Sequence, residues 1–227
     1  VVNNTLTNII SIDKVDNDTI YAYANTEEMR LFEKLGYKYS IIPQSSINAK
    51  SITMATTVDQ MAGWDRYPTY SVYRAMMKKF EHDFPVLCKL DSIGTTNNGH
   101  KIYVVKLSKN VSIEEPEVEV FYTSTMHGDE TTGFVLMLRL IDYMLSNYST
   151  STRIASMLDN MAIYINPDAN PDGTYMGGDN NLSGAIRYNA NYVDINRNFP
   201  DPRVSIGPQQ VETQIMMNFA TSRHFTL

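Results

Sequence analysis

The sequence predicts an α/β fold in which a mixed central sheet is flanked by helices and a small α+β unit lies at the N-terminus. Through most of the 227 residues, short segments of strand type are followed by amphipathic segments of helix type. A polar stretch over residues 44–57, rich in Ser, Thr and Asn, separates the first part of the chain from the rest. We therefore predict a small unit over residues 1–44, a linker over residues 45–60 and a main domain over residues 61–227.

The small unit contains a strand pattern over residues 19–24. Asn25 then starts a helix, because Glu28 lies three residues later in a capping-box pattern. Gly36 suits the position just after the end of that helix, and residues 37–42 predict a second strand. A unit this short cannot hold a large core, so we expect it to pack against the main domain as an accessory unit or to act as a pro-segment.

The main domain opens near Trp64, the only tryptophan, which we interpret as an anchor between elements. Thr69 can cap a helix that runs to about residue 82. The apolar side chains of this helix recur on one face and predict its buried side: Val72, Tyr73, Met76, Met77 and Phe80.

Two strands over residues 87–95 and 101–108 are predicted to form a hairpin around Asn97-Asn98-Gly99. His100 lies beside that turn, and we expect it to be solvated. Cys88 is the single cysteine, so it cannot form an internal disulfide and is expected to be a buried apolar side chain.

Further strand patterns cover residues 118–125 and 161–165. The near-continuous apolar character of the first favours a central position in the sheet. Residues 131–148 and 152–158 predict helices, and Pro208 suits the first turn of a last helix, which runs to about residue 222. The longest of these helices has a clear core face: Phe134, Leu138, Ile141 and Leu145.

Charge and hydropathy argue against two classes of partner. The formal net charge is −6, so no basic surface is expected for the phosphates of nucleic acids. No apolar run approaches the ~18 residues of a membrane span. The chain begins at Val1 without an initiator methionine, which favours a mature chain whose targeting segment has been removed.

His127 and Glu130 follow a predicted strand and precede a predicted helix. In open α/β sheets, ligands bind at this edge. An imidazole and a carboxylate on one tight turn, which also carries Gly128, could hold one zinc ion, since zinc accepts N and O donors. Such a short motif also occurs by chance. In the alternative interpretation His127 caps the helix, and Glu130 interacts favourably with the helix dipole.

After residue 165 the sequence is rich in Asn, Pro, Asp and Gly, and a long loop reaches about residue 201. A structureless connection of more than ~15 residues usually serves function. In this loop, Arg187, Asn196 and Arg197 could bind a substrate. One guanidinium can hold a carboxylate through two bonds, and a second can stabilise a developing oxyanion. Alternatively, the arginines form surface ion pairs with Asp194 and Asp201.

Three motifs together resemble the zinc metallocarboxypeptidase family, in particular the branch with H-G-x-E, N-P-D-G and D-x-N-R-N-F-P-D. The resemblance covers about residues 64–227. The chain carries the motifs in the family order: His127-Gly128-Asp129-Glu130, Asn170-Pro171-Asp172-Gly173 and Asp194-Ile195-Asn196-Arg197-Asn198-Phe199-Pro200-Asp201. The resemblance implies that residues 61–227 are the N-terminal part of a zinc carboxypeptidase catalytic domain.

By this resemblance, His127 and Glu130 are two of three Zn2+ ligands, and Asp194 is the carboxylate that orients the ligand histidine. The family's third ligand, a histidine, lies just beyond the strand that starts here near Phe225, and its general-base glutamate and a tyrosine follow later. The sequence ends at residue 227, so we expect a domain truncated at the C-terminus. His224 precedes that strand and is not assigned to the metal.

The resemblance also implies that Arg187 polarises the scissile carbonyl, while Asn196 and Arg197 hold the C-terminal carboxylate of a peptide or protein substrate. It implies hydrolysis of the last peptide bond by a zinc-activated water, in a secreted or periplasmic protein. Two other functions stay open. One is a related zinc amidohydrolase that acts on N-acyl amino acids, and the other is a non-catalytic module that binds peptide C-termini.

Overall fold

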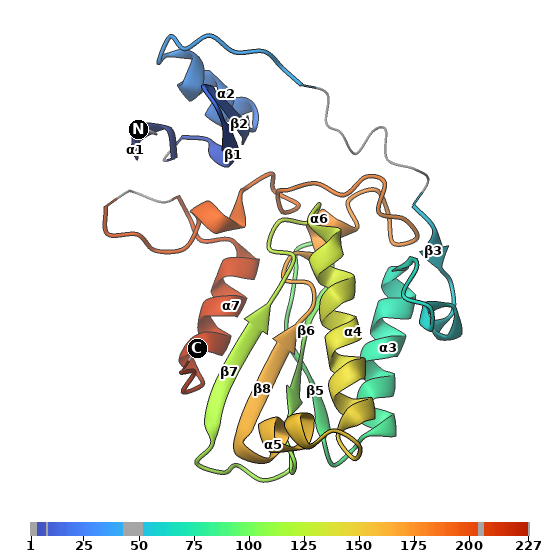
Figure 1. Cartoon of the computed structure of the whole chain (residues 1–227). Helices are drawn as coiled ribbons and strands as arrows, with labels where there is room; N and C mark the ends of the chain where they lie inside the picture. Colours follow the sequence, from blue (N-terminus) through green and yellow to red (C-terminus); the bar gives the residue numbers. More distant parts are fainter. Residues whose placement is uncertain (1–3, 8, 43–51, 204–206, 227) are drawn as a thin grey trace.

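The computed structural model describes residues 4–7, 9–42, 52–203 and 207–226. The main domain is built on a four-stranded sheet with the order β5-β6-β8-β7 (Figure 1). The strands are β5 (Cys88–Thr95), β6 (Lys101–Leu107), β7 (Val118–Thr123) and β8 (Met161–Asn166). Only the β7–β8 pair is parallel, so the sheet is mixed, as predicted.

Helices cover both faces of this sheet. The helices α3 (Tyr70–Asp83), α4 (Thr131–Asn147) and α5 (Thr152–Asn160) share one core with the strands. The helix α7 (Val211–Thr221) lies on the other face, where Phe219 packs against Val104 and Tyr164. Neighbouring residues of a strand face opposite sides, and accordingly Val105 belongs to the first core and Val104 to the second.

The predicted core faces of α3 and α4 are confirmed. All five predicted residues of α3 are buried, and Phe134, Leu138 and Ile141 of α4 are 0% exposed. Full burial of one such side chain stabilises a fold by about 1.5–3 kcal/mol. Cys88 is also 0% exposed, and burial raises the pKa of its thiol to about 12, as expected for an inert apolar side chain.

The hairpin of β5 and β6 is also confirmed, with Thr95 opposite Lys101 beside the predicted turn. The strand β5 has an irregular register between Ser92 and Gly94. A Cβ atom on Gly94 would lie 2.3 Å from Cδ1 of Ile215. This glycine therefore allows α7 to pack closely against β5.

Three expectations about the main domain are wrong. The strand β7 lies at one end of the four-stranded sheet rather than at its centre, and on its outer side Phe225 alone of the described residues forms a β-bridge, to Glu119. The last helix starts at Val211, after Pro208, because Gln210 keeps extended backbone and its N–H donates to Oδ1 of Asn198. His100 is buried instead of solvated.

The N-terminal unit contains α1 (Asn4–Thr7), the antiparallel strands β1 (Ser11–Asp16) and β2 (Thr19–Tyr23), and α2 (Thr26–Glu33). The predicted capping box is confirmed: Asn25 Oδ1 accepts the N–H of Glu28 at 2.9 Å, and Asn25 N–H donates to the Glu28 carboxylate. The strand predicted over residues 37–42 is wrong, since β2 pairs with β1 and residues 37–42 are irregular and exposed.

Residues 43–51, most of the predicted linker, lie outside the described residues. After them, β3 (Met54–Ala55) pairs in parallel with β4 (Tyr67–Pro68), and the 3-10 helix η2 (Val58–Met61) connects the two. Met61 and Ala55 are buried in the core beneath α3. Within the described residues, no helix combines the length and the apolar character that a membrane span requires.

Candidate functional site

The site lies where β7 ends and α4 begins. Glu130 is the N-cap residue of α4, but its side chain makes no capping bond to the helix. Its carboxylate Oε1 lies 3.0 Å from Nδ1 of His127 instead. The two side chains of the H-G-x-E motif therefore face each other. Glu130 makes no capping bond, but its place at the N-cap is also where its charge interacts favourably with the helix dipole.

His127 is 7% exposed and lies between two carboxylates. At 3.0 Å, a bare Nδ1 lone pair and the Glu130 oxygen would repel each other, so a proton or a cation belongs between them. Nε2 lies 3.3 Å from Oδ1 of Asp194, an ion-pair distance, although Nε2 has no hydrogen-bond partner of good geometry in the described structure. Burial alone would lower the pKa of His127, but its contacts with Asp194 and Glu130 raise the pKa to about 9.

Asp194 is the carboxylate at which the site residues meet. It is 1% exposed, and Oδ2 accepts bonds from Arg187 Nε at 3.1 Å and from the hydroxyl of Ser11. Its Oδ1 accepts the backbone N–H of Asn196 at 2.9 Å. Burial would raise the pKa of this carboxyl, but the bonds from His127 and Ser11 and the charge of Arg187 hold it well below the usual range.

The two loop arginines have different surroundings. Arg187 is 7% exposed, and Tyr23 of the N-terminal unit lies against it, with 5.2 Å from the guanidinium carbon to the ring centroid. Asn196 and Arg197 are exposed on the 3-10 helix η3 (Ile195–Arg197). Arg197 borders a hollow of about 200 Å³ that Asp194 also lines. The alternative of surface ion pairs is only partly right about the partners: Arg187 pairs with Asp194, but this pair is buried, and Asp201 pairs with Arg203.

The buried turn after β8 is a part of the site that the sequence analysis did not assign. Its Asn170 is 0% exposed, and its Nδ2 donates to the carbonyls of Met126 and Tyr188, both at 3.2 Å. One carboxamide thus joins the His127 turn to the Arg187 loop. The repeated Asn-Pro-Asp triplet was the available signal, because such residues in a buried turn must bond to neighbouring backbone.

Glycine is required where these segments meet. A Cβ atom on Gly128 would lie 2.3 Å from the carbonyl carbon of Gly173, 2.4 Å from the backbone N of Thr174 and 2.6 Å from the carbonyl oxygen of Ile186. All three are backbone atoms that cannot move aside. The glycine of H-G-x-E therefore lets the N-P-D-G turn and the Arg187 loop touch the His127 turn.

His100 contacts the N-P-D-G turn through Asp172. Its Nδ1 lies 2.6 Å from Oδ1 of Asp172, and its Nε2 lies 3.0 Å from Oδ1 of Asp179. Burial would lower the pKa of His100, but the bonds to the two carboxylates raise it. The Thr96 hydroxyl also donates to Asp172, at 2.6 Å. The β5–β6 turn is thereby fixed to the N-P-D-G turn.

Asp168 is a buried acid in this turn. It is 0% exposed, and its Oδ1 accepts bonds from the Thr174 hydroxyl and the N–H of Asn170, while Oδ2 has no partner among the described residues. Burial raises its pKa to about 7. At neutral pH, this carboxyl group is therefore protonated in a large fraction of the molecules.

The donor set fits a zinc ion in part. His127 Nδ1 and Glu130 Oε1 face one point, and Asp194 faces Nε2, which matches an imidazole ligand with a carboxylate behind it. Within the described residues, no group of three His, Cys, Asp or Glu side chains is arranged to hold a metal. His224 lies away from this pair, where its backbone N–H donates to the Glu119 carboxylate.

Comparisons with known proteins point to one family. The zinc carboxypeptidase family model matches residues 73–225. Human carboxypeptidase D is 35% identical over 154 residues, which are 66% of this chain and 11% of that protein. Carboxypeptidase SOL1 of Arabidopsis thaliana is 32% identical over 164 residues, 70% of this chain and 32% of that protein. The chain thus spans about a tenth to a third of the length of these curated relatives.

Solved structures share the fold. Carboxypeptidase A from Helicoverpa armigera matches 94% of this chain and 60% of its own, with a TM-score of 0.65 and 17% identity. Thrombin activatable fibrinolysis inhibitor matches 69% of this chain and 44% of its own, with a TM-score of 0.62 and 16% identity. Since the mixed sheet, the order of the three motifs and the match over residues 73–225 agree, the chain belongs to the zinc carboxypeptidase family.

Proposed function

We propose that this chain carries the metal-binding and carboxylate-binding part of an exopeptidase site, which removes the last residue of a peptide or protein. The observation that supports this most is the meeting of four side chains at one edge of the sheet. His127 faces both Glu130 and Asp194, and Arg187 bonds to that same Asp194.

His127 and Glu130 would hold Zn2+, and Asp194 would keep Nε2 of His127 turned away from the metal so that Nδ1 faces it. Bound zinc would supply a Lewis acid and lower the pKa of a water molecule. With two ligands from the described residues, we expect this chain alone to bind zinc weakly and not to turn over.

Asn196 and Arg197 would hold the C-terminal carboxylate of the substrate at the hollow beside Asp194. Arg187 would stabilise the negative charge that develops on the scissile carbonyl oxygen. Its Nε is bonded to Asp194, and its terminal amino groups make no hydrogen bond among the described residues, so they could bond to a substrate once Tyr23, which lies against the guanidinium, moves aside. Only the last residue of a chain carries a main-chain carboxylate one residue beyond the scissile bond, so a clamp for that group at Arg197 would favour exopeptidase action.

Peptide binding tests the carboxylate site. A peptide with a free C-terminus should bind more tightly than the same peptide as a C-terminal amide. Arg197→Ala should abolish this difference, which we expect to be about tenfold or more, since a charged hydrogen bond contributes about 1.5–3 kcal/mol. Arg203→Ala, an exposed arginine of the same loop, is the control. Equal binding of acid and amide by the unsubstituted chain would contradict the proposal.

Zinc titration and activity assays separate the other functions. Saturable tight zinc binding together with peptide hydrolysis by this chain would refute the two-ligand interpretation. Hydrolysis of N-acyl amino acids in preference to peptides would favour the amidohydrolase. Carboxylate-dependent binding without hydrolysis in the longest natural form of the protein would favour the non-catalytic module.

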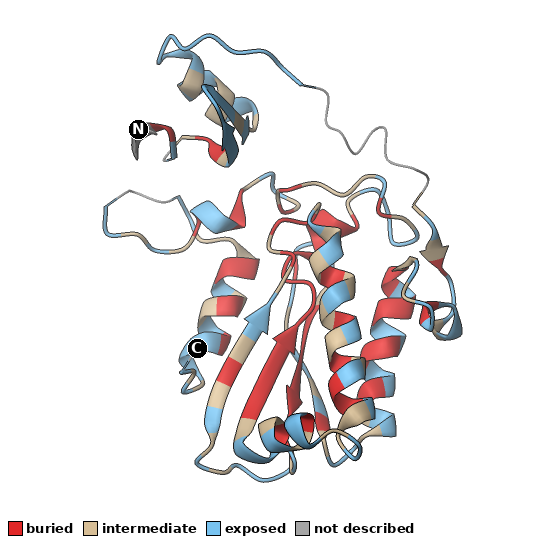
Figure 2. Ribbon diagram, viewed as in Figure 1, coloured by how far each residue is buried: buried red, intermediate tan, exposed pale blue. Residues whose placement is uncertain are grey.

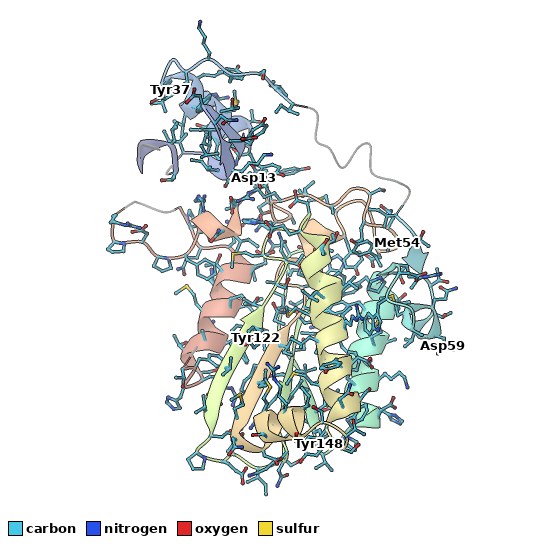
Figure 3. All side chains as sticks on the ribbon, in the orientation of Figure 1. Asp13, Tyr37, Met54, Asp59, Tyr122 and Tyr148 are labelled. Carbon is cyan, nitrogen blue, oxygen red and sulfur yellow. The ribbon has the colours of Figure 1, made fainter. Side chains whose placement is uncertain are left out.

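We also propose that residues 1–44 form an accessory unit that shields the site in the manner of a pro-segment. Ser11 bonds to Asp194, Tyr23 lies over Arg187, and the Tyr188 hydroxyl donates to Glu28 at 3.3 Å. Figure 3 shows Asp13 on the side of this unit nearest the main domain and Tyr37 on another side.

A secreted or periplasmic location, proposed from the family resemblance, is testable by cell fractionation.

Loss of the shielding contacts should expose the site. The double variant Ser11→Ala/Tyr23→Ala is expected to bind peptides with a free C-terminus several-fold more tightly than the unsubstituted chain. Tyr37→Ala, which removes a half-exposed tyrosine from the same unit, is the matched control. Unchanged binding in the double variant would show that the unit does not compete with peptides.

A further inference from the structure

A second hollow lies beside the start of α4. It has a volume of about 310 Å³ and is bounded by residues 64–67 and by four residues of the helix: Thr132, Val135, Leu136 and Arg139. These four recur at helical spacing and form one stripe along α4. Because Glu130 is the N-cap of the same helix and Thr132 follows two residues later, the hollow begins within one helical turn of Glu130 along the helix axis.

The first hollow adjoins the start of α7, whereas the second adjoins α4. Arg197 is next to Asn198, whose side chain bonds to Gln210 and Thr213 at the start of α7. The helix α7 covers one face of the sheet, and α4 covers the other. A peptide with its carboxylate at Arg197 and its last peptide bond at His127 would therefore continue onto the α4 side.

The chemistry of the second hollow suits a peptide with an acidic side chain. Arg139 is exposed and forms no ion pair with any described residue. The other arginine, Arg66, is neutralised by Asp65, with bonds of 2.8 and 3.3 Å. Leu136 is 55% exposed, and Trp64 is partly buried against the core. One unpaired cation thus lies beside an apolar wall.

Trp64 has an unusual backbone. Its φ is 52°, a left-handed conformation that costs an L-residue about 1–2 kcal/mol. A glycine at position 64 would avoid this cost, but the glycine of this segment is Gly63, one residue earlier. Non-glycine residues in such conformations cluster at binding sites. The strain therefore supports a role for the indole in the hollow beyond packing.

We propose that the hollow of Trp64, Leu136 and Arg139 is a subsite for the part of the peptide upstream of the scissile bond, and that it favours an acidic side chain. This inference rests on the proposed exopeptidase function. Arg139 lies nine residues after Glu130, or ~13 Å along the helix axis at 1.5 Å per residue. An extended peptide advances ~3.3 Å per residue, and helical side chains lean toward the N-terminus, so the acidic residue lies about two to four residues upstream.

Trp64 itself provides the measurement, because it is the only tryptophan of the chain. We would add acetylated, tryptophan-free hexapeptides to the protein and follow the fluorescence of Trp64. The peptides have a free C-terminus, and their last residue is a mixture of amino acids. In one series a single Glu moves through the upstream positions, and in the other Lys replaces it. Both the unsubstituted chain and Ser11→Ala/Tyr23→Ala are used, so that shielding by the N-terminal unit does not mask binding.

We expect the Glu peptides to bind about threefold to fivefold more tightly than the Lys peptides at one upstream position, with less difference at high salt. Arg139→Glu should reverse the preference. Arg153→Glu, at an exposed arginine of α5, should leave it unchanged. An identical fluorescence response to Glu and Lys peptides, or no response in either protein, would overturn the proposal.

Amide-terminated peptides separate this result from the proposed function. If the subsite exists but the carboxylate site does not, acid and amide peptides will bind equally and still prefer Glu. If the carboxylate site exists but the subsite does not, the free acid will bind more tightly and the upstream residue will have no effect.

Discussion

The N-terminal unit and the main domain differ in what holds their helices. The helix α2 has a complete capping box, yet none of its residues is buried. The helix α4 lacks a side-chain cap, yet five of its residues are buried, and Figure 2 shows this difference along the two helices. Since a cap contributes about 1 kcal/mol and a buried side chain about 1.5–3 kcal/mol, the main domain draws its stability from packing.

The N-terminal unit therefore depends on its contacts with the site. Leu6 and Ile10 of this unit are buried, but other large apolar side chains remain accessible, with Leu31 40% and Ile41 84% exposed. Its bonds to the main domain run from Ser11, Asn25 and Glu28 to the loop that carries Arg187. Local sequence signals suffice to shape such a unit, but burial decides which part of the chain resists unfolding.

Substitution of one glycine in each region should give the sharpest contrast. Gly128→Ala places a Cβ atom within 2.6 Å of three backbone atoms, so we expect a loss of more than about 4 kcal/mol or a failure to fold. Gly36→Ala, at φ 74° with open space around it, should cost about 1–2 kcal/mol within the N-terminal unit alone. Thermal unfolding and hydrogen exchange measure both. Equal global effects would contradict the contrast.

Asp168→Asn should change how the stability of the main domain depends on pH. The folded pKa of Asp168 is raised to about 7, so the stability that this group contributes is fully present below its unfolded pKa and is lost as the pH rises through about 7. The asparagine does not titrate. We therefore expect the variant to gain up to about 4 kcal/mol over the unsubstituted protein at pH 8, and little at pH 4.

Denaturant unfolding between pH 4 and pH 8 tests this expectation, with the exposed Asp91→Asn as the control for loss of one carboxylate. A stability difference that stays constant over this range would mean that Asp168 keeps the same charge in the folded and unfolded chains.

Truncation of one leucine in each region tests the role of burial directly. Leu138→Ala removes a side chain that is 0% exposed and should cost about 3 kcal/mol. Leu31→Ala removes one that is 40% exposed and should cost less than about 1 kcal/mol. Both are read from the midpoint of urea unfolding. A comparable cost for the two would show that α2 has a core of its own.

The smallest effect should come from the cap. Asn25→Ala removes both side-chain bonds to the start of α2, together with the exposed 3.3 Å bond to the Tyr192 carbonyl, and should destabilise that helix by about 1 kcal/mol. We expect faster hydrogen exchange in α2 and an unchanged midpoint for the main domain. A shift of the global midpoint would indicate that the two regions unfold together.

Structure is predictable from sequence where one local pattern determines it. Helical spacing predicts the core faces of α3 and α4, and the Asn-Gly turn predicts the β5–β6 hairpin. Features that depend on distant contacts are not predictable in this way. His100 follows a polar turn, but its burial depends on Asp172, which is 72 positions later in the chain. The strand β2 pairs with β1 rather than with residues 37–42, because the turn at Asn17, with φ 50°, brings β1 and β2 together.

The same distinction applies to the site. The H-G-x-E spacing brings His127 and Glu130 together through one turn, so the sequence can predict the pair. The contacts of Ser11 and Tyr23 with Asp194 and Arg187 join residues more than 160 positions apart, and no periodicity encodes them. The resemblance to a family predicts roles for Arg187 and Asp194 in the site, but it does not predict their contacts with the N-terminal unit.

The carboxamide of Asn170 has a thermodynamic consequence. It bonds to carbonyls on both sides of the site, so a shift of the segment around Tyr188 strains the segment around Met126. If a cation binds at His127 as proposed, a ligand that draws Arg187 toward itself is expected to change the affinity for that cation, and by reciprocity the cation would change the affinity for that ligand by the same factor. Inhibitor potency would then depend on how much metal is bound.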